Sequence, residues 1–250
     1  MIVVMLKSED IVAFNFDAKN VIKILYKVIM ITSKVKKQIP AKMRKFEPVD
    51  FSYLLSKVKD IDNELMKIHF KLYGGLVSAT NEALQLINKI EKKGIVKNMV
   101  IYSSVQKQLA FFFNGMRLHE MYFGVLCGEN MKNMDQDFKS DINKYFGSFD
   151  AWKTDFTKID GTIPGVGFVV LCRDRITGRL FNNWINEFQI GEIIGFDPIL
   201  VMDMWEHAYI SQFGLNLQKY QETFLNNVNW SVVSKCWHNS KNGTPNLLLK

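Results

Sequence analysis

The residues best suited to chemistry form the pentapeptide Asp203-Met204-Trp205-Glu206-His207. It follows an apolar run, residues 198–202, that is typical of a short buried strand. Asp203 and His207 are four positions apart, so in a helical turn their side chains would share one face. Burying a carboxylate and an imidazole together is unfavourable unless they are paired or bind something. The pair indicates either a metal site or a hydrogen bond between Asp203 and His207 without a metal.

The histidines supply further candidate ligands, and the chain has four: His69, His119, His207 and His238. The first three lie in apolar, helix-like segments, where a single histidine is more often a satisfied core residue than a ligand. His238 begins the polar C-terminal tail. Together with Asp203, the first three could offer three neutral nitrogens and one carboxylate. This donor set contains no thiolate and suits iron or manganese at least as well as zinc.

Hydrophobic periodicity predicts the elements that must position these residues. The N-terminal half is predicted to be helical over residues 50–72, 78–93 and 98–127. Gly74-Gly75 is expected to interrupt or kink the first helix, and Gly94 to end the second. The second half is predicted to hold a helix over residues 141–158 broken at Gly147-Ser148, strands over 166–173, 179–185 and 198–202, and helices over 215–228 and 231–237.

This order predicts an α+β fold: an N-terminal helical hairpin domain, then a C-terminal domain with a three-stranded antiparallel sheet and flanking helices. Residues 1–44 show no clear period and are expected to form an arm outside the fold. The expected bounds are 1–44 for the arm, 45–135 for the helical domain, 136–240 for the α+β domain and 241–250 for the tail.

Composition and charge indicate which classes of binding partner to expect. The 250-residue chain has a formal net charge of +7, but no basic run is dense enough to favour nucleic acid, so the charge suits the steering of a small anion. The longest apolar run, residues 21–31, is interrupted by lysines and is too short for a membrane helix, so no membrane partner is expected. Three widely spaced cysteines favour reduced thiols and a cytoplasmic location.

Six ordered segments between about residues 45 and 238 resemble the iron/manganese superoxide dismutases. Asp203–Tyr209 is similar to the family signature D-x-W-E-H-A-Y, and Asn114–Phe123 resembles the family's N-G-x-x-x-H-x-x-F-W. The other similar segments are Met66–His69, Phe146–Trp152, Gly165–Phe168 and Asn227–Trp230.

The resemblance implies dismutation of superoxide to oxygen and hydrogen peroxide by one iron or manganese ion per subunit. It implies that the metal ligands are His69, His119, Asp203 and His207. It also implies a homodimer or a tetramer in which Glu206 reaches the partner subunit's metal-ligand histidine. Trp205 and Tyr209 are expected beside the site. Two alternatives stay open: a non-catalytic structural subunit of a larger assembly, and another metal-dependent oxidoreductase on this fold.

The chain departs from the family around the expected ligands. Tyr73 stands where relatives usually have histidine, Val77 where they have a tyrosine, and Gly115 is the choice of manganese-type relatives. Those relatives supply an amide from the end of the strand hairpin to the metal-bound solvent. Glu187 occupies that position without a gap, while Gln189 has the amide chemistry. We expect Glu187 to take this role, with Gln189 and then Tyr73 as the alternatives.

Overall fold

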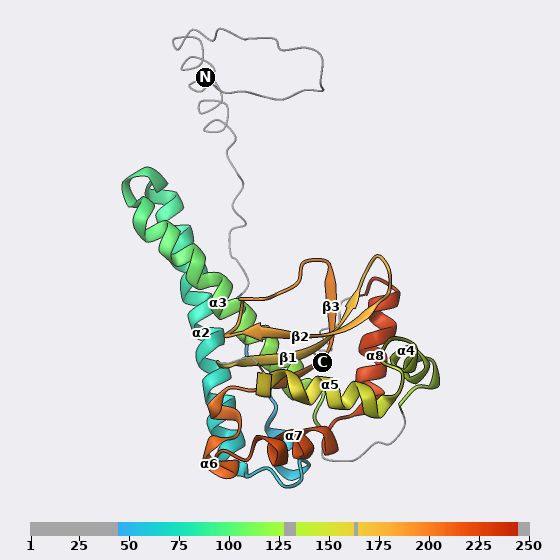
Figure 1. The fold of residues 1–250 in the computed structure, drawn as a ribbon. Helices are drawn as coiled ribbons and strands as arrows, with labels where there is room; N and C mark the ends of the chain where they lie inside the picture. Colours follow the sequence, from blue (N-terminus) through green and yellow to red (C-terminus); the bar gives the residue numbers. More distant parts are fainter. Residues whose placement is uncertain (1–44, 128–133, 163–164, 245–250) are drawn as a thin grey trace, which may run out of the picture. The chain divides into compact units, whose positions relative to one another are not determined.

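The computed structural model describes residues 45–127, 134–162 and 165–244, which belong to one compact unit (Figure 1). The expected arm, residues 1–44, lies outside the described residues, as do residues 245–250 of the expected tail. The fold is α+β as predicted, with helices first and a three-stranded antiparallel sheet after them. In the described residues, no helix is both long and apolar enough to cross a membrane.

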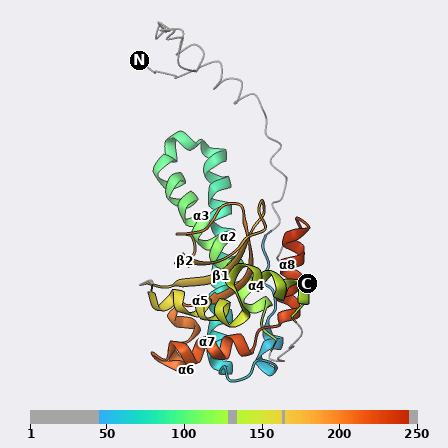
Figure 2. The same cartoon turned by 45° about the vertical axis from the view of Figure 1, so that its right-hand side comes forward.

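Two long helices, α2 (Asn63–Lys93) and α3 (Met99–Gly124), form an antiparallel hairpin. Asp62 caps α2, since its side chain accepts a hydrogen bond from the backbone N–H of Glu64. Gly94 ends α2 with a φ of 96°, as expected. The turn of the hairpin is a short 3-10 helix, η2 (Ile95–Asn98). Figures 1 and 2 show α2 and α3 side by side, with their joined end projecting past the sheet.

Two expectations about this region are wrong. The helix expected from residue 50 begins only at Asn63, where α2 starts. Before it, the chain forms only the short 3-10 helix η1 (Ser52–Ser56). Gly74-Gly75 does not interrupt the helix, because α2 continues through both residues. A glycine weakens a helix by only about 1 kcal/mol, and the packing of α2 along α3 outweighs that local preference.

The sheet has the order β2-β1-β3, with all neighbours antiparallel. Its strands are β1 (Gly167–Asp174), β2 (Leu180–Asn186) and β3 (Phe196–Asp203). The central strand β1 is almost wholly buried, which explains its continuous apolar sequence. Phe168 pairs with Asp203 in the register of β1 and β3, so the last residue of β3 lies beside the start of β1.

The predicted break at Gly147 is confirmed: a φ of 88° there separates α4 (Gln136–Phe146) from α5 (Phe149–Thr162). After β3 come η3 (Glu206–Ala208), α6 (Ile210–Phe213), α7 (Leu217–Asn226) and α8 (Trp230–Lys241). The helices α4, α5 and α8 pack against the sheet, and α6 and α7 lie beyond α5 (Figure 2). One hydrophobic cluster includes Tyr73 of α2, Phe123 of α3 and Phe168 of β1, so the helical hairpin and the sheet share a core.

Candidate metal centre

The four expected ligands come from four elements and meet at one point inside this core. His69 lies on α2, His119 on α3, Asp203 at the end of β3 and His207 in η3. One ligand atom from each lies within 4.8 Å of all the others. The side chains of His69, His119 and Asp203 are almost fully buried, whereas that of His207 is 20% exposed. Residues far apart in the sequence thus form a single buried donor set.

The local path from Asp203 to His207 is not the helical turn that the sequence suggested. Asp203 belongs to the strand, and Trp205 is still extended, with a φ of −74° and a ψ of 146°. The backbone N–H of Trp205 donates to Oδ1 of Asp203 at 2.9 Å, and only then does the chain enter the 3-10 turn. This hydrogen bond occupies Oδ1 and leaves Oδ2 directed at the imidazoles.

The spacing of the donor atoms fits one bound ion. Oδ2 of Asp203 lies 3.0 Å from Nε2 of His69, 3.3 Å from Nε2 of His207 and 3.5 Å from Nε2 of His119. Nε2 of His119 lies 3.4 Å from Nε2 of His207. Donors that bind one ion at about 2.1 Å are about 3.0 Å apart at 90° and about 3.6 Å apart at 120°. These four of the six donor pairs fall within this range, and all six lie within 4.8 Å.

Burial keeps two of the imidazoles in the neutral state that a metal requires. Burial lowers the pKa of His119 to about 3 and also lowers the pKa of His69, so both imidazoles are neutral at pH 7. Nδ1 of His119 lies 2.6 Å from the backbone oxygen of Gly115. A carbonyl can only accept, so Nδ1 carries the proton and Nε2 keeps its lone pair for a metal.

Asp203 is the one carboxylate in the cluster. Burial alone would raise its pKa, but hydrogen bonds and charge interactions with His207 and His69 hold the pKa well below its usual range. Its backbone oxygen accepts a 2.6 Å hydrogen bond from the hydroxyl of Tyr220 on α7. Sequence reasoning missed Tyr220, since nothing near it in the sequence points to β3. The donor set is therefore three imidazoles and one anionic carboxylate, which suits iron or manganese.

Aromatic rings enclose the ligands. Trp205 stacks on the ring of His207 with centroids 5.7 Å apart, and Phe188 stacks on Trp205 at 4.8 Å. Phe168 lies 5.7 Å from the ring of His119, and Phe188 lies 5.9 Å from it. These contacts fix the ring orientations and limit the access of water. Trp205 is thus beside the site, as expected.

The end of the hairpin differs from the expectation. We expected Glu187 or Gln189 to face the site, but Gln189 is exposed and Glu187 is only half-buried. The residue between them, Phe188, is buried against His119. Residues 187–189 do not continue as an extended strand, because Glu187 has a φ of 53°, which turns the chain. A side chain added at Gly115 would begin 3.2 Å from Phe188, so the glycine makes room for this ring.

Tyr73 was considered as a partner of the metal-bound solvent, but its hydroxyl hydrogen-bonds to protein groups instead. It is buried, and its hydroxyl donates to Oε1 of Glu120 at 2.9 Å while accepting from the backbone N–H of Val49 at 3.0 Å. Burial raises the pKa of Tyr73, so it stays protonated. The other oxygen of Glu120 accepts from Arg117 at 2.5 Å. Sequence reasoning missed this buried Tyr73–Glu120–Arg117 network, although its acid follows His119 directly.

Comparison with known proteins agrees with this geometry. The family model described as iron/manganese superoxide dismutases, C-terminal domain, matches residues 134–236. The iron superoxide dismutase of Pyrobaculum aerophilum is 27% identical over 186 residues, which are 73% of this chain and 87% of that protein. The manganese superoxide dismutase of Mycobacterium leprae is 28% identical over 189 residues, covering 75% of this chain and 90% of that protein.

A third relative extends the similarity. The manganese/iron superoxide dismutase of Aeropyrum pernix is 30% identical over 192 residues, which are 76% of this chain and 88% of that protein. The matched stretches span most of both chains, and the four residues that the resemblance implies as ligands converge in the structure. The chain belongs to the iron/manganese superoxide dismutase family.

Proposed function

We propose that this chain dismutates superoxide at one iron or manganese ion held by His69, His119, Asp203 and His207. The observation that carries the proposal is the buried cluster of four donor atoms, all within 4.8 Å of one another. Two superoxide ions and two protons give one molecule of oxygen and one of hydrogen peroxide. The ion, when bound, supplies the one-electron chemistry that joins the two halves of this reaction.

The chain's own residues prepare the site for this chemistry. Asp203 brings a single negative charge to the ion, and the imidazoles bring none, so the protein offsets only part of the metal charge. This leaves the centre attractive to an anion. The net charge of +7 favours the approach of superoxide from solution. The ring of Phe188, packed on Trp205 and near His119, keeps this side of the site apolar.

A non-catalytic structural subunit is the alternative that the sequence left open. A subunit of that kind has no need to keep four donors in binding geometry inside the core. Here the donors are retained, buried and correctly spaced. Because buried polar groups are expensive without a partner, this cluster favours the enzyme.

A superoxide-decay assay on iron-loaded and manganese-loaded protein tests the proposal. We expect rapid decay with at least one metal, and loss of that activity in Asp203→Asn, which keeps the shape of the side chain but removes its charge. The matched control is Asp197→Asn, because Asp197 lies on the same strand but pairs with Arg175. Equal activity in Asp203→Asn and the control, or no activity with either metal, would sink the proposal.

We also propose that the enzyme is a homodimer joined beside the metal centre. Glu206 is exposed although it directly precedes a ligand. His207 is the most exposed of the four ligands. A carboxylate from a second subunit could therefore reach this imidazole, which supports the arrangement that the family resemblance implies.

We further propose that the protein acts as an antioxidant enzyme in the cytoplasm. Its three cysteines cannot all form disulfides within one chain. Burial raises the pKa of the Cys172 thiol to about 12 and that of Cys236 to about 11, so both stay protonated and unreactive. Fractionation of cells that produce the protein, followed by immunodetection, would test this location.

A further inference from the structure

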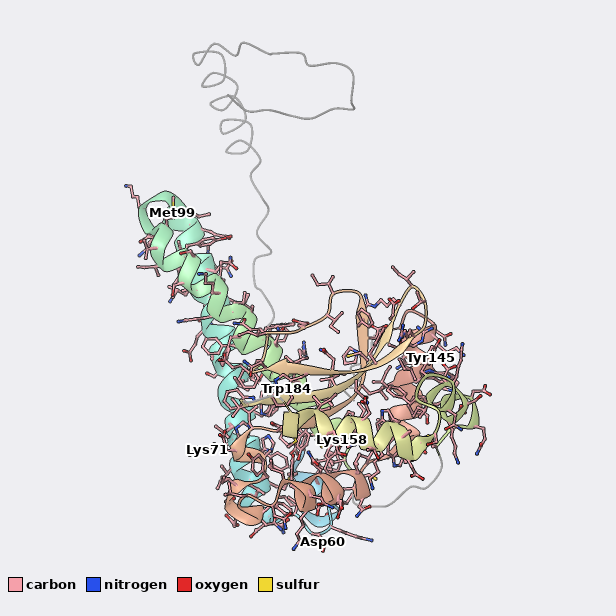
Figure 3. All side chains as sticks on the ribbon, in the orientation of Figure 1. Asp60, Lys71, Met99, Tyr145, Lys158 and Trp184 are labelled. Carbon is pink, nitrogen blue, oxygen red and sulfur yellow. The ribbon has the colours of Figure 1, made fainter. Side chains whose placement is uncertain are left out.

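The joined end of the α2–α3 hairpin exposes an apolar cluster. We call residues Lys89–Ile101 the hairpin tip. Within it, the exposed fractions are 39% for Ile95, 59% for Met99, 81% for Val100 and 52% for Ile101. Figure 3 labels Met99 at this projecting end, well away from the sheet. Single exposed apolar residues are common on protein surfaces. Three consecutive ones, Met99–Ile101, with Ile95 nearby, are unusual.

The fold itself does not require these side chains. Below the tip, α2 and α3 are held together by the buried cluster of Ala83, Ile87 and Val105. The first turn of α3 carries no acidic residue, and Asn98 provides no side-chain cap there. Polar residues are favoured at such positions. Neither helix capping nor charge at the start of α3 therefore accounts for Met99, Val100 and Ile101.

Positive charge lies next to this apolar cluster in the hairpin tip. The hairpin tip contains four lysines, Lys89, Lys92, Lys93 and Lys97, and one acidic residue, Glu91. All four lysines are exposed. Long lysine side chains keep their ammonium groups in a polar layer while their carbon chains lie along apolar surface. An apolar end with lysines next to it matches the layering of a membrane surface, where acyl chains lie beneath anionic headgroups.

We propose that the hairpin tip docks on an anionic lipid surface, inserting Met99, Val100 and Ile101 while the lysines contact the headgroups. A second copy of the chain fits less well, since two tips in contact would bring like charges together. A nucleic acid fits less well too, because it offers no apolar layer for Val100. The expectation of no membrane partner considered only the length of apolar runs, and the tip is apparent only once the hairpin is folded.

Co-sedimentation of the purified full chain with lipid vesicles tests this proposal. The probes are phosphatidylglycerol–phosphatidylcholine vesicles and pure phosphatidylcholine vesicles. We expect binding to the anionic vesicles, weaker by about tenfold for Val100→Asp because an apolar contact becomes a repelled charge. One lysine near such a surface strengthens binding about fivefold. The affinity of Lys97→Ala for anionic vesicles should therefore fall by that factor. The matched control is Ile176→Asp, because Ile176 is 93% exposed on the β1–β2 turn.

Each outcome either supports or overturns the docking of the hairpin tip. Superoxide decay by Val100→Asp should equal that of the unaltered protein, since this residue is remote from the metal centre. Absence of binding to anionic vesicles would overturn the proposal. So would equal binding by Val100→Asp, which would place the contact elsewhere on the chain. Without vesicles, sedimentation of Val100→Asp at a lower molecular mass than the unaltered protein would also overturn the proposal. The tip would then be a contact between subunits.

Discussion

Asp203 connects most of the contacts that define the metal centre. Its Oδ2 faces three imidazoles, its Oδ1 accepts from the backbone of Trp205, and its backbone oxygen accepts from Tyr220. The contacts of Oδ1 and Oδ2 orient the carboxylate, and the hydrogen bond from Tyr220 holds the backbone that carries it. The ligand geometry therefore depends on the last residue of β3 and on a tyrosine from α7, in addition to the three histidines.

The buried histidines predict how the metal-free protein responds to acid. The pKa of His119 is about 3 in the fold against 6.5 for an ordinary histidine. Between these values the unfolded chain binds a proton that the folded chain does not, so stability falls as the pH drops below 6.5. The slope from this one group approaches about 1.4 kcal/mol per pH unit. Urea unfolding of metal-free protein across this range measures it.

A pair of variants provides the control for this acid effect. His119→Gln should reduce the slope of stability against pH, whereas Gln189→Ala should leave it unchanged, because Gln189 is exposed and does not titrate. An identical slope in His119→Gln and the unaltered chain would contradict the assignment.

Phe188 gives a second prediction at this scale. Phe188→Ala would leave a cavity among Phe111, Phe168 and Trp205 and should lower the free energy of unfolding by about 3–5 kcal/mol. Gln189→Ala should change it by less than about 0.5 kcal/mol, because Gln189 is exposed. Chemical denaturation measures both. A larger loss in Gln189→Ala than in Phe188→Ala would show that the role of this turn is misassigned.

At the residue scale, the sequence predicted those parts of the site that depend on residue type and on spacing along the chain. Residue type made the three histidines and Asp203 a possible donor set, because few residue types bind metals, and the family resemblance implied them as ligands. Phe188 was not predictable, because its position depends on the left-handed backbone of Glu187 and on the space above Gly115. The Tyr73–Glu120 hydrogen bond joins two helices, and no local pattern reveals such a contact.

At the scale of elements, α2 carries the first ligand, His69, and extends to the hairpin tip. The sequence predicted its end at Gly94 because a glycine with positive φ is a local signal. It failed at Gly74-Gly75, where packing against α3 decides the structure. The bounds of the three strands were predicted to within two residues, since their apolar runs and turns are local features.

Replacing these glycines tests whether α2 is continuous and unstrained. A Cβ at Gly74 or Gly75 would meet no atom within 4 Å. Gly74→Ala and Gly75→Ala should each raise the free energy of unfolding by about 0.5–1 kcal/mol, because alanine loses less backbone entropy in a helix. Gly94→Ala is the control and should lower it, because the φ of Gly94 is 96°. Destabilisation by all three substitutions would refute the picture of an unbroken, unstrained helix.

At the scale of the whole molecule, the exposed side of the metal centre is where a second subunit would complete the site. Glu206→Ala should weaken the proposed dimer by about 2 kcal/mol or more, because it would leave the partner's imidazole without its carboxylate. Sedimentation velocity over a dilution series measures the association, and the superoxide-decay assay measures activity. Glu222→Ala, an exposed acidic residue on α7, is the control. Unchanged association and activity in Glu206→Ala would refute this interface.

The most direct measurement is the metal content of the purified full chain. The structure predicts one iron or manganese ion per chain, little zinc, and loss of the ion in Asp203→Ala, which leaves three imidazoles without their anionic partner. Inductively coupled plasma mass spectrometry on both proteins gives the stoichiometry. Protein that holds only zinc and consumes no superoxide after reconstitution with iron or manganese would contradict the assignment of the metal centre, as would full metal occupancy in Asp203→Ala.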